Sequence, residues 1–442
     1  MNEPIFSLSD FAQRSTSPSA VNELTASFAK DFREGIDINL GVGYVNDSTI
    51  PKESIAKAYN AIVSNEKQYR NTLNYGSAKG APALRNAIKN YYVRNNIGEL
   101  TPQQWKELDV CIGANGATSI LESIADIIKP GIVITSDPFY YIYTNTLKRK
   151  GFTVIAIPEE SDGINLNALE ETLRNIDASQ ISFFYIVTVN NPSTVILSNF
   201  KRQQLCTLIK DLSIKHNRLI PLFFDKAYED IIHANNILPP ISGLQFNDLG
   251  NVFEIGTLSK VIAPALRIGY LIAKESAFTK LLVQKTSDIG FSAPLITQNI
   301  AAWLLDNIIE EQRKRVNKGY KEKSSLIKDF LATELSEYVE HYEGGKAAFY
   351  YYITLKRIET DRNSHFYKYL SRTTGKPEVD GVSILNSRLV YIPGEICSNN
   401  NNARYQLRIA YGHPSIEALK RALKLIKEAC VYSLSGGLPF RS

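Results

Sequence analysis

GTLSKVIAPALRIGYLIA, residues 256–273, is the most informative segment of this 442-residue chain. Apolar residues flank a turn rich in hydroxyl groups that ends at Lys260, and Arg267 follows seven residues later. Burial and a neighbouring cation lower the pKa of a lysine, and such an amine can attack a carbonyl carbon to form a Schiff base. The hydroxyl groups of Thr257 and Ser259, together with Arg267, suit a bound phosphate dianion. The segment therefore predicts a reactive lysine beside an anion site.

Short apolar runs before and after this segment predict an α/β fold. Each run is too short for a helix and lacks strict alternation, which is typical of strands buried on both faces of a mostly parallel sheet. These runs are 132–134, 181–189, 219–224, 252–255 and 268–273. Elsewhere, residues 55–63 and 120–128 place apolar side chains at helical spacing. We therefore expect a large sheet with helices between its strands.

From about residue 300 the pattern changes and predicts a second, smaller α+β domain. A long helical stretch at 294–335 leads into strands near 347–355 and 388–392, and an amphipathic helix follows at 416–430. We expect three parts: an N-terminal segment (1–50) that packs with the small domain, a large α/β domain (51–300) and the small C-terminal domain (301–442).

Polar residues follow several of the predicted strands. LFFDKAYEDII, 222–232, places Asp225 at a strand end and Tyr228 three residues further on. In NNPSTVILS, 190–198, Asn191 precedes a proline, which holds its backbone extended. Ligands of open α/β sheets bind outside the carboxyl ends of the strands, so these side chains are candidates for one site. Taken singly, each also fits an ordinary turn or, for Tyr228, a packed core aromatic.

CIGANGATSILESIADII, 111–128, adds a second candidate anion site. A turn of small residues opens directly into a helix, whose first amide groups and dipole attract anions. The turn residues are Gly113, Ala114, Asn115 and Gly116. The segment is not a GxGxxG fingerprint, and an ordinary helix start is the alternative. Tyr140, in DPFYYIY, follows where an aromatic ring could stack on a cofactor ring.

Composition restricts the classes of function that remain. The chain is 44% apolar and 21% charged with a net charge of +5, which is typical of a globular protein without a basic nucleic-acid surface. Four dispersed cysteines and five scattered histidines form neither a disulfide framework nor a metal-ligand pattern. No apolar run could span a bilayer, and the N-terminus lacks the pattern of a signal or transit peptide. We expect a cytoplasmic protein with reduced thiols, no metal, and no nucleic-acid or membrane partner.

The order and spacing of these motifs resemble the fold-type I enzymes that use pyridoxal 5'-phosphate (PLP), in the class I/II aminotransferase family. In that family a phosphate turn, a stacking aromatic, an Asn-Pro, an Asp-x-x-Tyr and an S-x-S-K lysine with an arginine seven residues on occur in this order, before a late arginine. Here the late arginine is Arg408, in YQLRIAYG. The resemblance extends from about residue 36 to 430. Thr257, Ala265 and Cys397 depart from the common pattern, but no departure removes a catalytic group.

The resemblance implies a mixed, mostly parallel seven-stranded sheet beside the smaller domain, and a homodimer with sites at the subunit interface. Lys260 would hold the cofactor and act as a general base, and Asp225 and Tyr228 would tune the cofactor. The implied cofactor-binding set is Gly113, Ala114, Asn115, Tyr140, Asn191, Asp225, Tyr228, Thr257, Ser259, Lys260, Arg267, and Tyr75 reaching across to the neighbouring subunit. The substrate would contact Asn191, Gly43 and Arg408, the last through a planar two-bond grip on its α-carboxylate.

Within the family, the chain looks most similar to the 2-aminoadipate and aromatic (kynurenine-type) aminotransferases. It would move an amino group from an L-amino acid to a 2-oxo acid such as 2-oxoglutarate. Two alternatives stay open. A PLP-dependent C–S or related lyase on the same fold would use the same residues. A regulatory domain of a transcription factor would bind PLP without catalysis, but about 35 residues precede the resemblance, which is too few for a winged helix.

Overall fold

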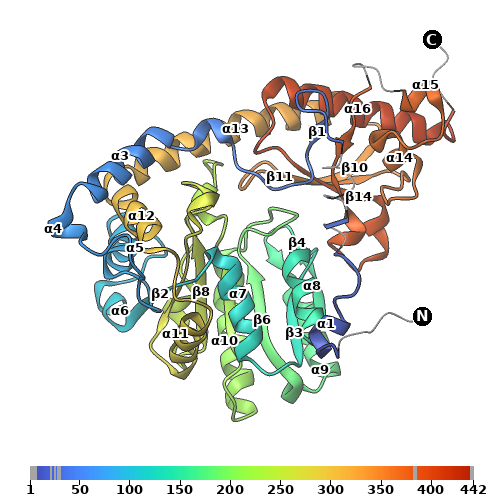
Figure 1. Cartoon of the computed structure of the whole chain (residues 1–442). Helices are drawn as coiled ribbons and strands as arrows, with labels where there is room; N and C mark the ends of the chain where they lie inside the picture. The colour runs from blue at the N-terminus through green and yellow to red at the C-terminus, as the bar shows by residue number, and fades with distance from the viewer. Residues whose placement is uncertain (1–6, 20–21, 24–25, 27–30, 382–385, 439–442) are drawn as a thin grey trace.

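The computed structural model describes residues 7–19, 22–23, 26, 31–381 and 386–438. A mixed eight-stranded sheet with helices on both faces forms its larger part, and a smaller sheet lies beside it (Figure 1). In spatial order the large sheet contains β2 (Leu108–Ile112), β9 (Gly269–Lys274), β8 (Val252–Thr257), β7 (Leu222–Asp225), β6 (Ile181–Val187), β3 (Ile132–Asp137), β4 (Thr153–Glu160) and β5 (Gly163–Ile164). The five strands from β8 to β4 are parallel, whereas β9 and β5 run antiparallel to their neighbours.

The apolar runs of the sequence form the middle of this sheet because both of its faces are covered. Every residue of β6 and β7 is buried. Alternate side chains enter opposite cores, with Phe184 and Phe224 in one and Phe183 and Phe223 in the other. The predicted fold class is confirmed, with eight strands rather than seven because the two-residue β5 adds an edge to β4.

The helices divide between the two faces of the large sheet. One core includes residues of α3 (Lys52–Val63), α5 (Pro82–Arg94), α9 (Leu166–Asn175), α10 (Asn199–Lys215) and α12 (Leu295–Asn307). The other core includes residues of α7 (Gly116–Ile127), α8 (Tyr141–Arg149) and α11 (Ala277–Asp288). The helical patterns found in the sequence at 55–63 and 120–128 lie almost wholly in α3 and α7. The helices thereby bury both faces of the strands whose carboxyl ends carry the polar residues.

The smaller sheet is antiparallel and is reached through α13 (Ile309–Thr333) (Figure 1). The stretch 294–335, predicted as one helical stretch, is divided into α12 and α13 because Ile308 leaves the helical conformation at φ −136°. The sheet contains, in order, β10 (Val339–Gly344), β11 (Tyr350–Leu355), β14 (Gln406–Ala410) and β13 (Ile392–Pro393). Its helices are α14 (His365–Ser371), α15 (Pro377–Asp380) and α16 (Ile416–Leu434).

Residues 38–40 of the N-terminal segment lie beside strands of the second half of the chain, whereas the ring of Phe11, earlier in the segment, lies 5.7 Å from Nζ of Lys150, which follows α8. β1 (Ile38–Asn39) pairs in parallel with β12 (Leu389–Val390). The backbone oxygen of Leu40 then accepts a hydrogen bond of 2.7 Å from the amide of Ala410. Gly41, the next residue, therefore lies beside Arg408, whose Nη2 donates to the Gly41 backbone oxygen.

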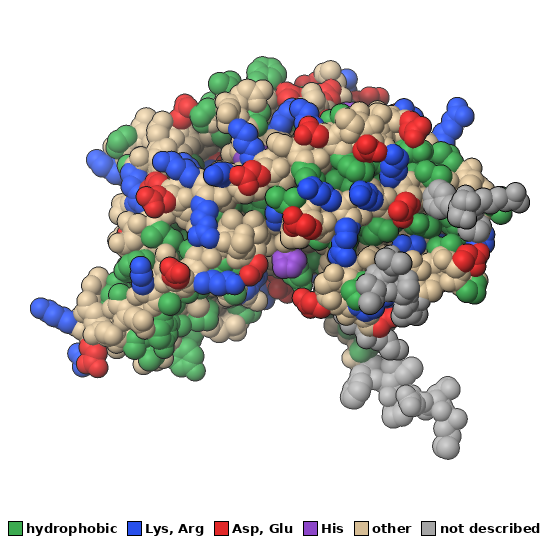
Figure 2. Space-filling model, turned by 90° about the horizontal axis from the view of Figure 1, so that it is seen from above, with side chains coloured by type: hydrophobic (Ala, Val, Ile, Leu, Met, Phe, Trp, Pro, Cys, Tyr) green, Lys and Arg blue, Asp and Glu red, His purple; other side chains and the backbone are tan. Residues whose placement is uncertain are grey.

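Short helices complete the described chain: α1 (Asp10–Gln13), α4 (Glu66–Tyr69), α6 (Pro102–Glu107) and 3-10 turns at Asp47–Thr49, Ala178–Gln180, Glu229–Ile231, Gly243–Phe246, Pro264–Leu266, Gly394–Ile396 and Asn401–Tyr405. Among the described residues, none of the helices is long and apolar enough to cross a membrane. On the face seen in Figure 2, basic and acidic side chains alternate rather than gather by sign.

Candidate active site

Lys260 lies in the turn after β8, at the carboxyl end of the parallel strands. Burial, together with the positive charges of Arg267 and Arg408, lowers its pKa to about 8, and the charge of Asp225 opposes this shift. Its Nζ lies 5.7 Å from the centre of the Tyr228 ring. A lysine with this pKa has a neutral, nucleophilic fraction near neutral pH.

Asp225 ends β7 and is 5% exposed. Its Oδ2 accepts a 2.7 Å hydrogen bond from the Tyr185 hydroxyl, and its Oδ1 accepts one of 3.0 Å from the Ala227 amide. Burial raises the pKa of Asp225, while these two bonds and the charge of Lys260 oppose the rise. A buried carboxylate held by neutral donors is stabilised by any cationic group that reaches it.

Arg267 and the small-residue turn before α7 form one unit. The Arg267 guanidinium donates to Asn115 Oδ1 at 2.6 Å and to the Asn115 backbone oxygen at 3.1 Å. Gly116 has φ +67°, and a Cβ there would lie 2.7 Å from Arg267 Nη2, so a side chain at this position would be strained and would displace the guanidinium. The Thr257 and Ser259 hydroxyls lie 2.9 Å apart nearby. An arginine, two hydroxyls and the start of a helix of twelve residues are groups that can bind a phosphate.

A cavity of about 120 Å³ connects these groups. Of the residues predicted from sequence, it is lined by Tyr140, Asn191, Asp225, Tyr228, Thr257, Ser259, Lys260 and Arg267. Ala117, Thr118, Leu121, Val187, Ala227 and Pro264 complete the lining. None of the turn residues Gly113, Ala114 and Asn115 lines the cavity, but Asn115 accepts two hydrogen bonds from Arg267, which does. The tertiary structure therefore gathers residues from five separate motifs around one space.

Arg408 adjoins this cavity from the small sheet and is 2% exposed. Its Nη1 donates to Asn191 Oδ1 at 3.0 Å, and its Nη2 donates to the Gly41 backbone oxygen. Asn191 Nδ2 in turn lies 3.4 Å from the Tyr228 hydroxyl. The Nε of Arg408 is buried and has no hydrogen-bond partner among the described residues. A buried donor without a partner can bind an acceptor such as a carboxylate.

Six of the predicted residues are not part of the lining: Gly113, Ala114, Asn115, Arg408, Tyr75 and Gly43. Tyr75 is 82% exposed, and its ring centre lies 5.7 Å from that of Phe291. Gly43 lies against the Tyr350 hydroxyl, since a Cβ at Gly43 would be only 2.3 Å from it. Neither residue belongs to the lining of the cavity within one chain.

Three residues that the sequence reasoning missed support the site. Tyr185 binds Asp225, as described above. The Tyr350 hydroxyl lies 3.0 Å from that of Tyr228. Glu159 accepts hydrogen bonds from Asn190 and Ser193, on either side of Asn191, and burial raises its pKa to about 8. For Tyr185 and Tyr350 the available signal was a tyrosine inside an apolar strand, because a buried hydroxyl requires a partner.

Comparisons with known proteins give a family match and several similar structures. A sequence model of the family described as "Aminotransferase class I and II" matches residues 36–426. The kynurenine aminotransferase of Pyrococcus horikoshii, solved in complex with PMP, has a TM-score of 0.80 at 21% identity over 97% of this chain and 98% of that one. LysN, the alpha-aminoadipate aminotransferase of Thermus thermophilus, has a TM-score of 0.77 at 20% identity over 97% and 98%. An uncharacterized HTH-type transcriptional regulator of Bacillus subtilis, YisV, is 22% identical over 88% of this chain and 73% of its own length.

Proposed function

The chain belongs to the aminotransferase class I and II family, and from that premise we propose that the residues around Lys260 are its active site. It is a PLP-dependent aminotransferase, which moves an amino group from an amino acid to a 2-oxo acid. The observation that carries the site assignment is that one cavity joins Lys260, whose pKa is lowered to about 8, to Asp225, a buried carboxylate held by neutral donors.

The donor set of this cavity fits PLP. Asp225 would bind the protonated ring nitrogen of PLP. The positive charge of that nitrogen would stabilise the buried Asp225 carboxylate. Tyr228 and Asn191 would bind the ring oxygen, and Tyr140 would stack on the ring. The phosphate would be held by Gly113, Ala114, Asn115, Thr257, Ser259 and Arg267. The missing side chain of Gly116 leaves the room that this cradle needs.

Bound PLP supplies an electron-withdrawing ring that makes the Cα–H bond of the amino acid acidic. Lys260 removes the proton from Cα, and its lowered pKa keeps part of the amine in the basic form. Arg408 binds the α-carboxylate through its unpaired Nε and a neighbouring Nη, while Asn191 and Gly41 fix the guanidinium. This grip orients the Cα–H bond toward Lys260. Gly43, beside Tyr350, lies where the substrate would enter.

We further propose that the amino donor is aromatic or 2-aminoadipate and that 2-oxoglutarate is an acceptor. Two proteins that share the fold are named as a kynurenine aminotransferase and an alpha-aminoadipate aminotransferase, which supports the choice of amino donor. The rings of Tyr141 and Tyr350 lie 5.7 Å and 4.7 Å from the Arg408 guanidinium, so aromatic surface borders the place of the substrate.

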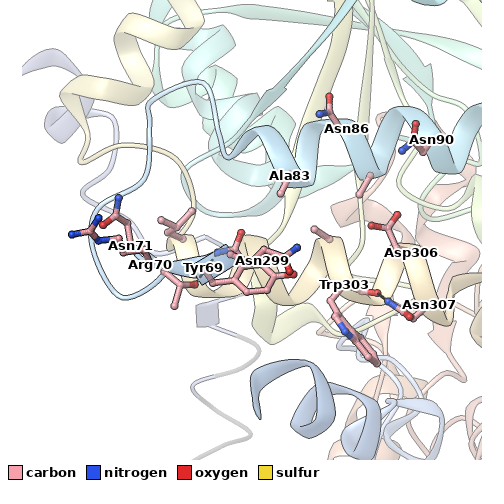
Figure 3. A pocket seen from close by; sticks show the side chains of 15 residues that line it. Tyr69, Arg70, Asn71, Ala83, Asn86, Asn90, Asn299, Trp303, Asp306 and Asn307 are labelled. Carbon is pink, nitrogen blue, oxygen red and sulfur yellow. Dashed lines mark hydrogen bonds between the residues drawn. The ribbon is translucent and has the colours of Figure 1, made fainter. Parts of the chain in front are cut away.

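We also propose a homodimer in which Tyr75 reaches the phosphate of the neighbouring subunit. Tyr75 and Leu73, with exposures of 82% and 75%, are large apolar side chains on a loop beside an open groove. Figure 3 shows the groove between α5, which carries Asn86 and Asn90, and α12, which carries Trp303. Exposed apolar side chains of this size are typical of an interface.

A regulatory role is the second candidate, because the chain is 22% identical to the regulator YisV over 73% of that protein's length. A regulator would bind PLP without turning over amino acids. A lyase would use the same residues and differ only in its products. The four cysteines are buried and free, which supports a reducing, cytoplasmic location.

The test is to reduce the purified, PLP-loaded protein with borohydride and locate the modified lysine, and then to screen amino donors with 2-oxoglutarate and pyruvate. We expect the label on Lys260, and oxo-acid-dependent turnover that Lys260→Ala abolishes. Label on another lysine would overturn the site. Ammonia release without an oxo acid would indicate a lyase, and PLP binding without turnover of any donor would indicate a regulator.

A further inference from the structure

Tyr350 joins three parts of the site that are far apart in the chain. It begins β11 and is 1% exposed. Its hydroxyl lies 3.0 Å from that of Tyr228, which lies just after strand β7 of the large sheet. Its ring lies 4.7 Å from the guanidinium of Arg408, on the adjacent strand of the small sheet. Its hydroxyl also fills the space beside Gly43, in the N-terminal segment.

The hydroxyl of Tyr350 can determine which way the Tyr228 proton points. Asn191 Nδ2 faces the Tyr228 oxygen at 3.4 Å, and an amide nitrogen can only donate. If Tyr350 also donates to that oxygen, the hydrogen of Tyr228 is left free to point into the cavity, which Tyr228 lines. Accepting two hydrogen bonds polarises the O–H group of Tyr228 and makes it a stronger donor there.

The ring of Tyr350 has a separate effect on Arg408. The guanidinium lies near two aromatic rings, Tyr350 at 4.7 Å and Tyr141 at 5.7 Å from their centres. The nitrogen atoms of the Arg408 guanidinium donate hydrogen bonds to Asn191 and to the Gly41 backbone oxygen. These two hydrogen bonds limit sliding of the guanidinium, whereas a ring above it limits its rotation.

We propose that Tyr350 is a positioning residue with two separable roles: its hydroxyl donates to Tyr228 and strengthens the hydrogen bond of Tyr228 to the ring oxygen of PLP, and its ring fixes the plane in which Arg408 receives a carboxylate. This inference rests on the proposed function of the site.

Two variants separate the two roles. Tyr350→Phe removes the hydroxyl and keeps the ring, whereas Tyr350→Leu removes both. Tyr351→Phe is the matched control, because Tyr351 is buried on the same strand but its hydroxyl binds Ser324 at 3.1 Å on the opposite face. If Tyr350→Leu does not load PLP, Tyr350→Met replaces it.

The first measurement is the pH midpoint at which the absorbance of the PLP-loaded enzyme changes without substrate. The second is the Kd of 3-phenylpropionate, a carboxylate with no amine to react. In Tyr350→Phe we expect the midpoint to rise by about half a pH unit or more, as loss of one hydrogen bond would produce, with Kd unchanged within about twofold. In Tyr350→Leu we expect Kd to rise by about tenfold as well. Tyr351→Phe should change neither.

The inference is overturned if the midpoint of Tyr350→Phe stays in place or falls, or if Tyr350→Phe weakens binding as much as Tyr350→Leu does. Equal shifts in Tyr351→Phe would reduce Tyr350 to a general structural residue. A wild-type protein that forms no lysine-linked PLP would instead overturn the proposed function. If the wild-type protein forms the lysine-linked PLP but the Tyr350 variants keep the wild-type pH midpoint and Kd, only this inference is overturned.

Discussion

Replacing Arg408 by lysine keeps the positive charge and removes the planar pair of donors. Arg408 is 2% exposed, and its guanidinium is fixed by Asn191 at 3.0 Å and by Gly41. Its Nε has no partner among the described residues and remains for the substrate. A lysine ammonium cannot reproduce a two-bond grip on a carboxylate. Loss of one partner of a buried charged pair costs about 2–5 kcal/mol, or on the order of thirtyfold to several thousandfold in kcat/KM.

The assay is kcat/KM for the best amino donor in Arg408→Lys, together with a PLP titration. PLP absorbance should survive, because Asp225, Lys260 and Arg267 are untouched. Arg404→Lys is the matched control, since that side chain is 57% exposed and lies 3.7 Å from Glu359. An unchanged kcat/KM in Arg408→Lys would refute the assignment of the carboxylate. Lost PLP with intact substrate binding would show that Arg408 serves the cofactor instead.

Three further predictions concern the cofactor and the interface. Asp225→Ala should bind PLP weakly and lose about 3–4 kcal/mol of transition-state stabilisation, measured as kcat; a near wild-type kcat would make Asp225 only a turn residue. Recombination of PLP with the cofactor-free protein should accelerate about tenfold per pH unit below pH 8 and level off above it, because the neutral amine of Lys260 is the nucleophile; a flat stopped-flow profile would contradict this. Mixing Tyr75→Phe with Lys260→Ala subunits should restore activity, since a hybrid dimer has one site with neither change. No recovery after demonstrated subunit exchange would exclude the shared site.

The sequence predicted the elements whose burial is uniform. Residues 181–189 and 252–255 correspond to the buried strands β6 and β8, because a strand covered on both faces has a continuous apolar run. It did not predict β2 or β4. In β4 most residues are partly or fully exposed, so no apolar run marks it. The break at Ile308 between α12 and α13 was also missed, because apolar spacing continues across it.

The site divides in the same way between local and long-range information. The sequence alone determined that Lys260 follows a buried strand in a hydroxyl-rich turn, and that Asp225 and Asn191 follow two others. Local burial and chain stiffness decide such features, and both depend on residues that are close in the sequence. Only the tertiary structure decided that Arg408 meets Asn191, 217 residues earlier, and that Tyr350 meets Tyr228, 122 residues earlier. Contacts at these separations depend on how the small sheet packs against the large one, and no local periodicity encodes that arrangement.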